Sequence, residues 1–522
     1  MDKRLLSFKP NWRRPHRTAL DFDDDRFCMK QSRWLRWSFL ALLIVGTQAK
    51  AADAGSLPDP VVQARIARVE QGLTTRIVVK GAAGRKMSLV ERMAYHQVPA
   101  VSIALINDGR VEWTRAHGVA DAGGTQPVDP GTLFQAGSIS KAITAIGAMQ
   151  RVEQGQLSLD KEANLQLVSW KIPDNDFTRR RPVTLRMLLN HSAGTTVHGY
   201  DGYARAEPLP TLLQDLDGIA PANAAPVRVD VLPGSLWRYS GGGYSVIQQL
   251  MEDAGEQPFA ALIGHGVLEP LGMADSTFAV PLPPAREGHA ASGHDGQGHA
   301  IEGRWRNYPE AAPAGLWSTP RDLARVVLAV QQASAGRTGG ILSPESVRMM
   351  LTRGLGEYGL GFFVEDLGDR TSFSHSGGVA GFRAQLYGYT GTGQGVVVMT
   401  NSDSGAALID EILCSIAAEY GWPEFKVLEK TPAAVDVAAN RQAAGDYLLL
   451  DRPARIVAEG ERLFFQSPLF GAHRMELFPE APGSYFMTAQ DMTLRLERDA
   501  DGQVGGLTLL RGAGRYSAKR MR

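Results

Sequence analysis

Cysteine is almost absent from this chain, and an excess of charge of either sign is absent altogether. The 522 residues include only two cysteines, Cys28 and Cys414, so no disulfide framework is expected. The 55 basic side chains are balanced by 55 acidic ones, which argues against nucleic acid or an anionic membrane surface as the main partner. A phosphate-cradling glycine motif and a Cys/His cluster with zinc-ligand spacing are also missing. These absences leave a globular chain, long enough for two domains.

Long apolar runs are missing too, apart from one short stretch near the N-terminus. Residues 37–46, WSFLALLIVG, follow three basic residues and precede Ala49-Lys50-Ala51, which fits a cleavage site. The run is too short to span a bilayer comfortably. The pattern predicts a signal peptide over residues 29–51, cleaved after Ala51, and a periplasmic or secreted protein that meets the membrane only through this segment. An uncleaved anchor is the alternative.

The first 28 residues differ in composition from the rest of the chain. They contain the acidic run DFDDDR and scattered arginines, and we expect them to be disordered. Because the signal begins at Met29, we expect residues 1–28 to be an extension that precedes the natural start. After cleavage Cys414 would be the one remaining cysteine, free and buried.

The remaining residues divide into two predicted domains. Residues 56–425 begin and end with strand patterns, such as VPAVSIALINDGRVEW and GVVVMTN, around a long helical middle. This order predicts an α/β (α+β) domain with a mixed, largely antiparallel sheet, flanking helices and an inserted helical subdomain. Residues 426–440 look like a linker. Short alternating strands over residues 441–522 predict a small antiparallel β-barrel.

A serine and a lysine three residues apart stand at the start of an apolar helix pattern. Ser138 and Lys141 lie on one face of this predicted helix, whose N-terminus favours developing negative charge. Burial would lower the lysine pKa towards that of a usable base. The alternative is a helix-capping serine followed by a lysine that reaches solvent. A second copy, Ser158 and Lys161, lies in a polar turn where the lysine would be solvated.

Two later segments hold further candidates. Tyr239 precedes Ser240 and three glycines, which let a substrate approach the backbone, and a tyrosine beside a lysine can move protons. His375 ends an apparent strand, and the glycines after it permit close alignment of a substrate and an oxyanion-binding N–H. A buried core tyrosine and a structural histidine are the alternatives. Another His-x-Gly, at His294, lies in a polar loop with no strand around it.

Three motifs in this order, Ser138-x-x-Lys141, Tyr239-Ser240-Gly241 and His375-Ser376-Gly377, resemble those of the serine β-lactamase and penicillin-recognising enzyme family. The chain looks most similar to the branch of class C β-lactamases and D-alanyl-D-alanine carboxypeptidases, with its esterase relatives. Segments such as VTLRMLLNHSAGT and GLWSTPRDLARVV match as well, over roughly residues 60–422. The tail from about residue 440 resembles the lipocalin-like barrel that some family members carry.

The resemblance implies a serine hydrolase that uses no metal or organic cofactor. Ser138 would be the acylated nucleophile, and Lys141 would take its proton. Tyr239 would transfer protons to the leaving group and activate the deacylating water, while His375 would orient the substrate and Tyr239. The oxyanion hole would be formed by the backbone N–H groups of Ser138 and Gly378. The remaining substrate-binding positions would be Gly241, Ser376 and Gly377.

Two departures from the family pattern bear on the substrate. The second motif normally ends in asparagine, where this chain has Gly241, and the third is His-Ser-Gly rather than Lys-Thr-Gly. Both changes argue against efficient β-lactam hydrolysis and fit peptidases or esterases at least as well. The expected substrate is therefore a β-lactam, a D-amino-acid peptide or an ester. A catalytically silent periplasmic binding or sensor protein stays open as an alternative, and the sequence makes no prediction of the oligomeric state.

Overall fold

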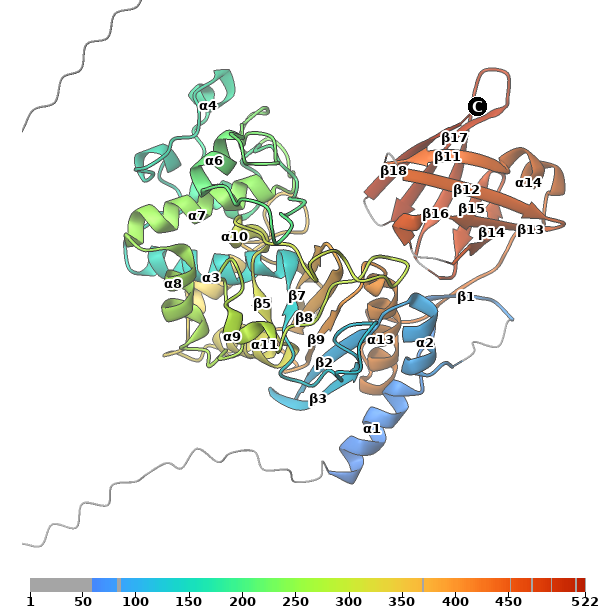
Figure 1. Cartoon of the computed structure of the whole chain (residues 1–522), viewed down its shortest axis with the longest axis horizontal. Coiled ribbons are helices and arrows are strands. Elements are labelled where there is room, and N and C mark those ends of the chain that lie inside the picture. Colours follow the sequence, from blue (N-terminus) through green and yellow to red (C-terminus); the bar gives the residue numbers. More distant parts are fainter. Residues whose placement is uncertain are drawn as a thin grey trace, which may run out of the picture. The chain divides into compact units, whose positions relative to one another are not determined.

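The computed structural model describes residues 59–81, 86–368, 370–450, 452–470, 473–489, 491–511 and 514–521 (Figure 1). The expected extension over residues 1–28 and the expected signal peptide over residues 29–51 lie outside the described residues. Within the described ranges, no helix is both long and apolar enough to cross a membrane.

A six-stranded sheet forms the centre of the larger fold. Its order is β3-β2-β9-β8-β7-β6, and every neighbouring pair is antiparallel. Strands from the start and the end of the domain meet in the middle of the sheet, so the sheet closes late in the sequence, as predicted. The strands are β2 (Ala100–Asn107), β3 (Arg110–Gly118), β6 (Phe363–Asp366), β7 (Thr371–Val379), β8 (Phe382–Tyr389) and β9 (Gly395–Thr400).

Both faces of this sheet are covered by helices, and the side chains of β2 divide between two cores. Ala104 and Ile106 pack into one core with helices α3 (Ser140–Glu153) and α11 (Pro320–Ser334). Alternate residues of β2, among them Ile103, pack into the other core. Because successive side chains of a strand point to opposite faces, a strand buried on both sides is apolar throughout. Figure 1 shows the helices of the second core together: α1 (Pro60–Glu70), α2 (Leu89–His96) and α13 (Gly405–Tyr420).

The inserted region between β3 and β6 is mostly helix and loop, as the sequence predicted. Its three long helices are α3, α11 and α7 (Gly241–Gly255). The last of these is buried along most of its length. The shorter helices are α4 (Asp176–Arg180), α5 (Leu185–Leu189), α6 (Leu212–Asp217), α8 (Phe259–Ile263), α9 (Pro284–Glu287), α10 (Ala311–Ala314) and α12 (Pro344–Met350).

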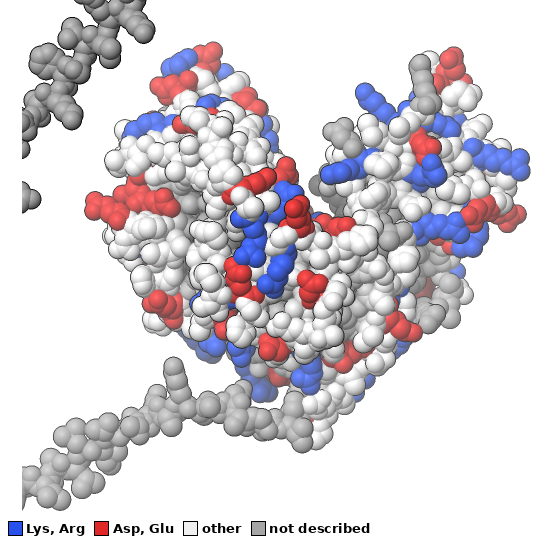
Figure 2. Space-filling view, in the orientation of Figure 1, with Lys and Arg blue, Asp and Glu red and all other residues white. Residues whose placement is uncertain are grey.

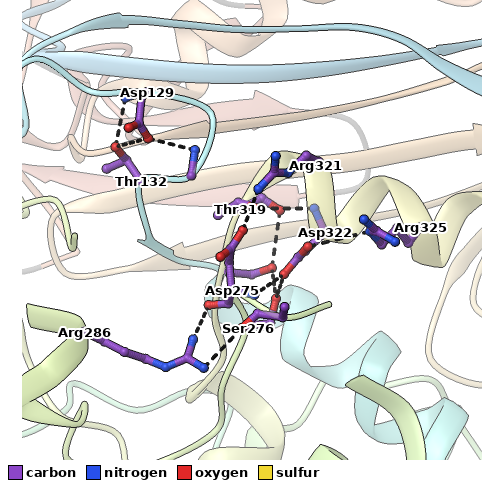
Figure 3. A network of polar contacts seen from close by, with 12 residues as sticks. Asp129, Thr132, Asp275, Ser276, Arg286, Thr319, Arg321, Asp322 and Arg325 are labelled. Atoms are coloured by element: carbon purple, nitrogen blue, oxygen red, sulfur yellow. Dashed lines mark hydrogen bonds and ion pairs between the residues drawn. The ribbon is translucent and has the colours of Figure 1, made fainter. Parts of the chain in front are cut away.

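A polar network fixes the chain just before α11 (Figure 3). Thr319 caps that helix by accepting a hydrogen bond from the Asp322 backbone N–H at 3.1 Å. The Asp322 carboxylate in turn accepts from Ser276 Oγ at 2.9 Å and from the Asp275 N–H at 3.0 Å. Arg286 donates to the Asp275 carbonyl oxygen at 2.6 Å. The network holds the loop around residue 275 against the first turn of α11.

The C-terminal part forms a closed barrel of eight strands in sequential order, which confirms the predicted β-barrel. Its interior is filled by apolar side chains such as Phe465, Met487 and Leu494. The short strand β10 (Leu428–Lys430), paired with β1 (Ile77–Val79), and the helix α14 (Val437–Ala443) precede it. The barrel strands are β11 (Gly445–Leu449), β12 (Arg452–Glu459), β13 (Arg462–Gln466), β14 (Met475–Ala481), β15 (Ser484–Met487), β16 (Thr493–Arg498), β17 (Val504–Arg511) and β18 (Gly514–Arg520).

Acidic and basic side chains are interspersed on the face shown in Figure 2, and no area of a single sign dominates it. This distribution agrees with the zero net charge of the chain. Cys414 on α13 is buried and free, as expected from the sequence.

Candidate active site

Ser138 lies in a single 3₁₀ turn, Gly137–Ile139, that leads into α3. The residue that precedes α3 is Ile139, which makes no side-chain cap, so the interpretation of Ser138 as a helix cap is wrong. The turn is reached through β4 (Phe134–Gln135), which pairs with β5 (Trp317–Ser318) beside the polar network before α11. Gly137 has φ +52°, a conformation that favours glycine, and the turn thereby exposes the serine beside the helix N-terminus.

Lys141 points back from the first turn of α3 towards this serine. Its Nζ lies 3.1 Å from Ser138 Oγ and 2.9 Å from the Pro313 carbonyl oxygen. The side chain does not reach solvent, because the residue is only 2% exposed. Burial lowers the pKa of Lys141 from 10.5 to about 7. A neutral amine in this position donates to the carbonyl and keeps its lone pair for the Ser138 hydroxyl proton, which is the arrangement of a general base.

The second Ser-x-x-Lys copy has none of these properties. Ser158 Oγ accepts a hydrogen bond from the backbone N–H of Lys161 at 3.3 Å, and the lysine side chain is exposed. The copy is a surface turn, as its polar sequence predicted.

Tyr239 is brought to the same place from the residues just before α7. Its ring centroid lies 4.8 Å from Lys141 Nζ, and its hydroxyl is close enough to Ser138 for that side chain to affect its pKa. Packing around the phenol raises the pKa of Tyr239 above its ordinary value, because burial disfavours the phenolate. With the pKa of Lys141 near 7 and that of Tyr239 raised, the lysine is the base of the pair and the tyrosine is a proton donor at neutral pH.

His375 lies on β7 and is 1% exposed. Its Nδ1 donates to the Ser376 carbonyl oxygen at 2.7 Å, and its Nε2 accepts from the Tyr358 hydroxyl at 2.9 Å. Burial, assisted by the charge of Lys141, lowers the pKa of His375 to about 3, so the ring is neutral at pH 7. The centroid of the His375 ring is 6.4 Å from that of Tyr239. Because its two nitrogens bond Ser376 and Tyr358, neither forms a hydrogen bond with Tyr239.

The glycines after His375 allow β7 to approach the serine turn. A methyl group on Gly377 would lie 1.9 Å from the Ala136 carbonyl oxygen, which only glycine avoids. A methyl group on Gly137 would lie 2.7 Å from the Gly378 nitrogen, so the residue before Ser138 packs directly on Gly378. β6 pairs with β7 only at residues 371–374, and Ser376 and Gly378 are exposed beyond that point. This edge of β7 is open to a substrate chain.

Gly241, the position where family members have asparagine, is covered by another side chain. A carbon added to Gly241 would meet the Tyr200 ring at 3.0 Å and the His198 carbonyl oxygen at 3.3 Å. The Tyr200 hydroxyl is hydrogen-bonded to Ser245 Oγ at 2.7 Å. An asparagine side chain at position 241 would have to displace this ring.

A pair of buried carboxyl groups lies behind Tyr200. Asp215 on α6 and Glu310, the residue before α10, are 1% and 0% exposed and face each other. Burial raises the pKa of Asp215 to about 6 and that of Glu310 well above its ordinary value. The Asp215 carboxylate also raises the pKa of Glu310, so Glu310 keeps its proton at neutral pH.

Several residues that line this site were not predicted from the sequence. They are His191, Tyr200, Tyr358 and the carbonyl group of Pro313, and each reaches the site from a separate loop or helix. The only signal was that His191 belongs to the matching segment VTLRMLLNHSAGT. His294, by contrast, is fully buried, and its ring bonds the Ala122 N–H and the Asn401 carbonyl group, so it is a structural residue.

Comparison with known proteins finds relatives of this chain in sequence and in fold. The family called Beta-lactamase matches residues 88–413. Penicillin-binding protein 4* of Bacillus subtilis (strain 168) is 25% identical over 413 residues, covering 73% of this chain and 86% of that protein. Esterase EstB of Burkholderia gladioli is 31% identical over 215 residues, covering 40% of this chain and 53% of that protein. The octameric penicillin-binding protein homologue from Pyrococcus abyssi has the same fold, with a TM-score of 0.56 and 23% identity over 82% of this chain and 98% of that one.

Proposed function

The chain belongs to the beta-lactamase family, and from that premise we propose that it is an exported serine hydrolase that forms an acyl-enzyme on Ser138. The observation that carries the proposal is the contact between Lys141 and Ser138, 3.1 Å long, in a setting that lowers the pKa of the lysine to about 7. A serine hydroxyl becomes a nucleophile when a base of suitable pKa lies within hydrogen-bond distance.

Acylation follows from this geometry. As Ser138 Oγ attacks the substrate carbonyl carbon, its proton passes to Lys141 Nζ. The carbonyl oxygen becomes an oxyanion, which the backbone N–H groups of Ser138 and Gly378 would stabilise across the contact between Gly137 and Gly378. One such donor typically contributes a factor of about one hundred to one thousand in turnover.

Collapse of the intermediate needs a proton on the leaving group. Tyr239 is a neutral phenol that lies beside Ser138 and Lys141, so it can donate this proton and recover one from the Lys141 ammonium. Water then attacks the Ser138 ester by the same route in reverse. In sum, one acyl bond is broken and one water molecule is consumed, and every group that moves a proton is a side chain of this protein.

Two substrate classes have separate support. A β-lactam or D-amino-acid peptide is supported by the relative named as a penicillin-binding protein. An uncharged ester is supported by His375, whose pKa of about 3 leaves no fixed positive charge for a substrate carboxylate at this position. It is also supported by Gly241, which has no side-chain amide to offer the substrate. The relative named as an esterase agrees with this second candidate.

The first test is the intact mass of the protein after brief exposure to a chromogenic cephalosporin, with its hydrolysis followed in the same tube. Ser138→Ala is treated in parallel. Rapid hydrolysis that the variant lacks would identify a β-lactamase, and a persistent adduct on the wild type alone would identify a slowly deacylating peptidase. If neither is seen, p-nitrophenyl acetate and D-alanyl peptides are tested in the same way. No adduct and no turnover with any of these would leave the silent binding protein as the better description.

Export is tested independently of activity. The signal pattern over residues 29–51 supports a mature N-terminus at Ala52 in the periplasm or medium. N-terminal sequencing of the protein from each cell fraction checks this, and an intact N-terminus in the cytoplasmic fraction would refute it.

A further inference from the structure

His191 holds the backbone on both sides of Tyr239. Its carbonyl oxygen accepts a hydrogen bond from the Arg238 N–H at 2.8 Å, and its Nδ1 accepts one from the Ser240 N–H at 3.1 Å. Between these two contacts, the imidazole and the Tyr239 ring lie with their centroids 4.3 Å apart. A single residue, 48 positions earlier in the chain, therefore fixes the two neighbours and the ring of the proposed proton donor.

The histidine ring is itself tightly enclosed. It is 2% exposed, and it contacts the rings of Tyr244 and Tyr358 at centroid distances of 5.3 and 4.7 Å. Because Nδ1 accepts from a backbone N–H, the neutral ring carries its proton on Nε2, which has no hydrogen-bond partner among the described residues. The backbone of His191 has φ +61°, a conformation that residues other than glycine adopt uncommonly. An unpaired buried N–H and an uncommon backbone conformation both disfavour the folded state, so packing alone does not explain a histidine here.

We propose that His191 is a positioning residue for Tyr239, acting through the acceptor Nδ1 and the stacked ring rather than by transferring a proton. The proposal rests on the proposed function, because it requires Tyr239 to be a proton donor at Ser138. The titratable side chains in contact with the ring are the phenols of Tyr239, Tyr244 and Tyr358. The groups whose charge acts on the ring are Lys141, His375 and His198, and no carboxylate is among them. Nothing in this setting favours a histidinium ion, and burial lowers the pKa of His191 well below its ordinary value.

The consequence is kinetic. Tyr239 and Ser240 form the entrance to α7, where Ser240 Oγ caps the helix by accepting from the Gly243 N–H at 3.0 Å. If the hydrogen bond from Ser240 to His191 is lost, the entrance to the helix can shift relative to Ser138. A misplacement of about 1 Å can slow a reaction by about one hundredfold. Deacylation, in which Tyr239 helps to activate water, is the step that should slow.

The test uses the full chain and p-nitrophenyl acetate, whose leaving group needs no proton. Acylation is measured by the burst of p-nitrophenol, deacylation by the steady-state kcat, and the concentration of active sites by labelling with a fluorophosphonate. His191→Ala is expected to lower kcat by about ten- to one hundredfold while kcat/KM stays within about threefold, because only deacylation depends on Tyr239. His191→Asn places an acceptor oxygen near the position of Nδ1 and tolerates the positive φ, so it is expected to keep kcat within about threefold of the wild type.

Two controls separate positioning from stability. His294→Ala removes a buried imidazole that also accepts a backbone N–H, at 3.0 Å, but lies outside the site; it is expected to lower the thermal midpoint without changing kcat per labelled site. In a Tyr239→Phe background, His191→Ala is expected to reduce kcat no further, because the two residues act through one group. If His191→Ala does not fold, His191→Gly, which suits the positive φ, replaces it.

The outcomes distinguish the two claims. Equal kcat values for His191→Ala and His191→Asn, a parallel fall of kcat and kcat/KM, or additive losses in the double variant would each overturn the positioning role while leaving the hydrolase intact. A wild-type chain that neither reacts with the fluorophosphonate nor releases p-nitrophenol would overturn the proposed function itself.

Discussion

Replacing Lys141 with methionine should abolish turnover and at the same time stabilise the protein. The buried amine has a pKa of about 7 in place of 10.5. Relative to the unfolded chain, this difference costs the folded state about 4 kcal/mol at pH 7. Lys141→Met removes the cost but leaves the Pro313 carbonyl oxygen without its donor, which costs about 1–3 kcal/mol. The net expectation is a free energy of unfolding about 2 kcal/mol higher than that of the wild type at pH 7.

The pH dependence has a definite sign. Because the folded-state pKa of Lys141 lies below its unfolded value, the folded state binds fewer protons between pH 7 and 10.5. The cost of the buried lysine is fully present below pH 7 and disappears as the pH rises towards 10.5. At pH 9.5 only about 1 kcal/mol remains, so the methionine variant should no longer be the more stable protein.

For a chain that begins at Ala52, urea unfolding followed by tryptophan fluorescence measures this difference in the larger domain alone, because all its tryptophans lie between residues 113 and 422. The matched control is Lys161→Met in the second Ser-x-x-Lys copy, whose exposed side chain predicts no change in stability or activity. Acylation by a fluorophosphonate should fall about a thousandfold in Lys141→Met. A variant that is less stable than the wild type at pH 7, or equally stabilised at pH 7 and 9.5, would refute the account of a desolvated neutral lysine.

Three further predictions test other parts of the site. Gly377→Ala places a methyl group 1.9 Å from the Ala136 carbonyl oxygen, so fluorophosphonate labelling should slow at least about tenfold and the thermal midpoint should fall. Asp215→Asn should raise the free energy of unfolding by about 1–3 kcal/mol at pH 8 and not at pH 4, because the raised pKa of Asp215 makes the wild type lose stability as pH rises from about 4 through 6; urea unfolding at both pH values checks this. Tyr239→Phe should lower kcat about one hundredfold or more with little change in the unfolding midpoint, since it removes the proton donor and preserves the ring.

The main elements of the fold were predictable from local patterns. Alternating apolar residues over residues 441–522 predicted the barrel, and strand patterns at both ends of the larger domain predicted a sheet that closes late. The arrangement of the sheet was not predictable to the same degree. The pairing of β2 with β9 depends on which strands find each other across almost 300 residues, and a strand period of two contains no information on that choice.

The candidate site shows a similar division. The apolar helix around Lys141 indicated burial, but the carbonyl group of Pro313 and the rings of Tyr239 and Tyr358 come from distant segments. The interpretation of Ser138 as a helix cap was wrong because the serine lies in a 3₁₀ turn, two residues before the helix starts, a difference within the usual uncertainty of helix boundaries. His191 was missed because its contacts with the backbone around Tyr239 have no counterpart in local periodicity.

The sequence by itself determined which chemical groups are available and in what order: a serine with a lysine one turn away, a tyrosine before glycines, a histidine before glycines and a barrel at the end. These are properties of short segments, and short segments determine side-chain identity and local conformation. Only the tertiary structure decided the protonation of those groups. A pKa depends on the solvent and charges within a few ångströms of the group, and for Lys141, Tyr239 and His375 the atoms that exclude solvent are brought there by long-range packing.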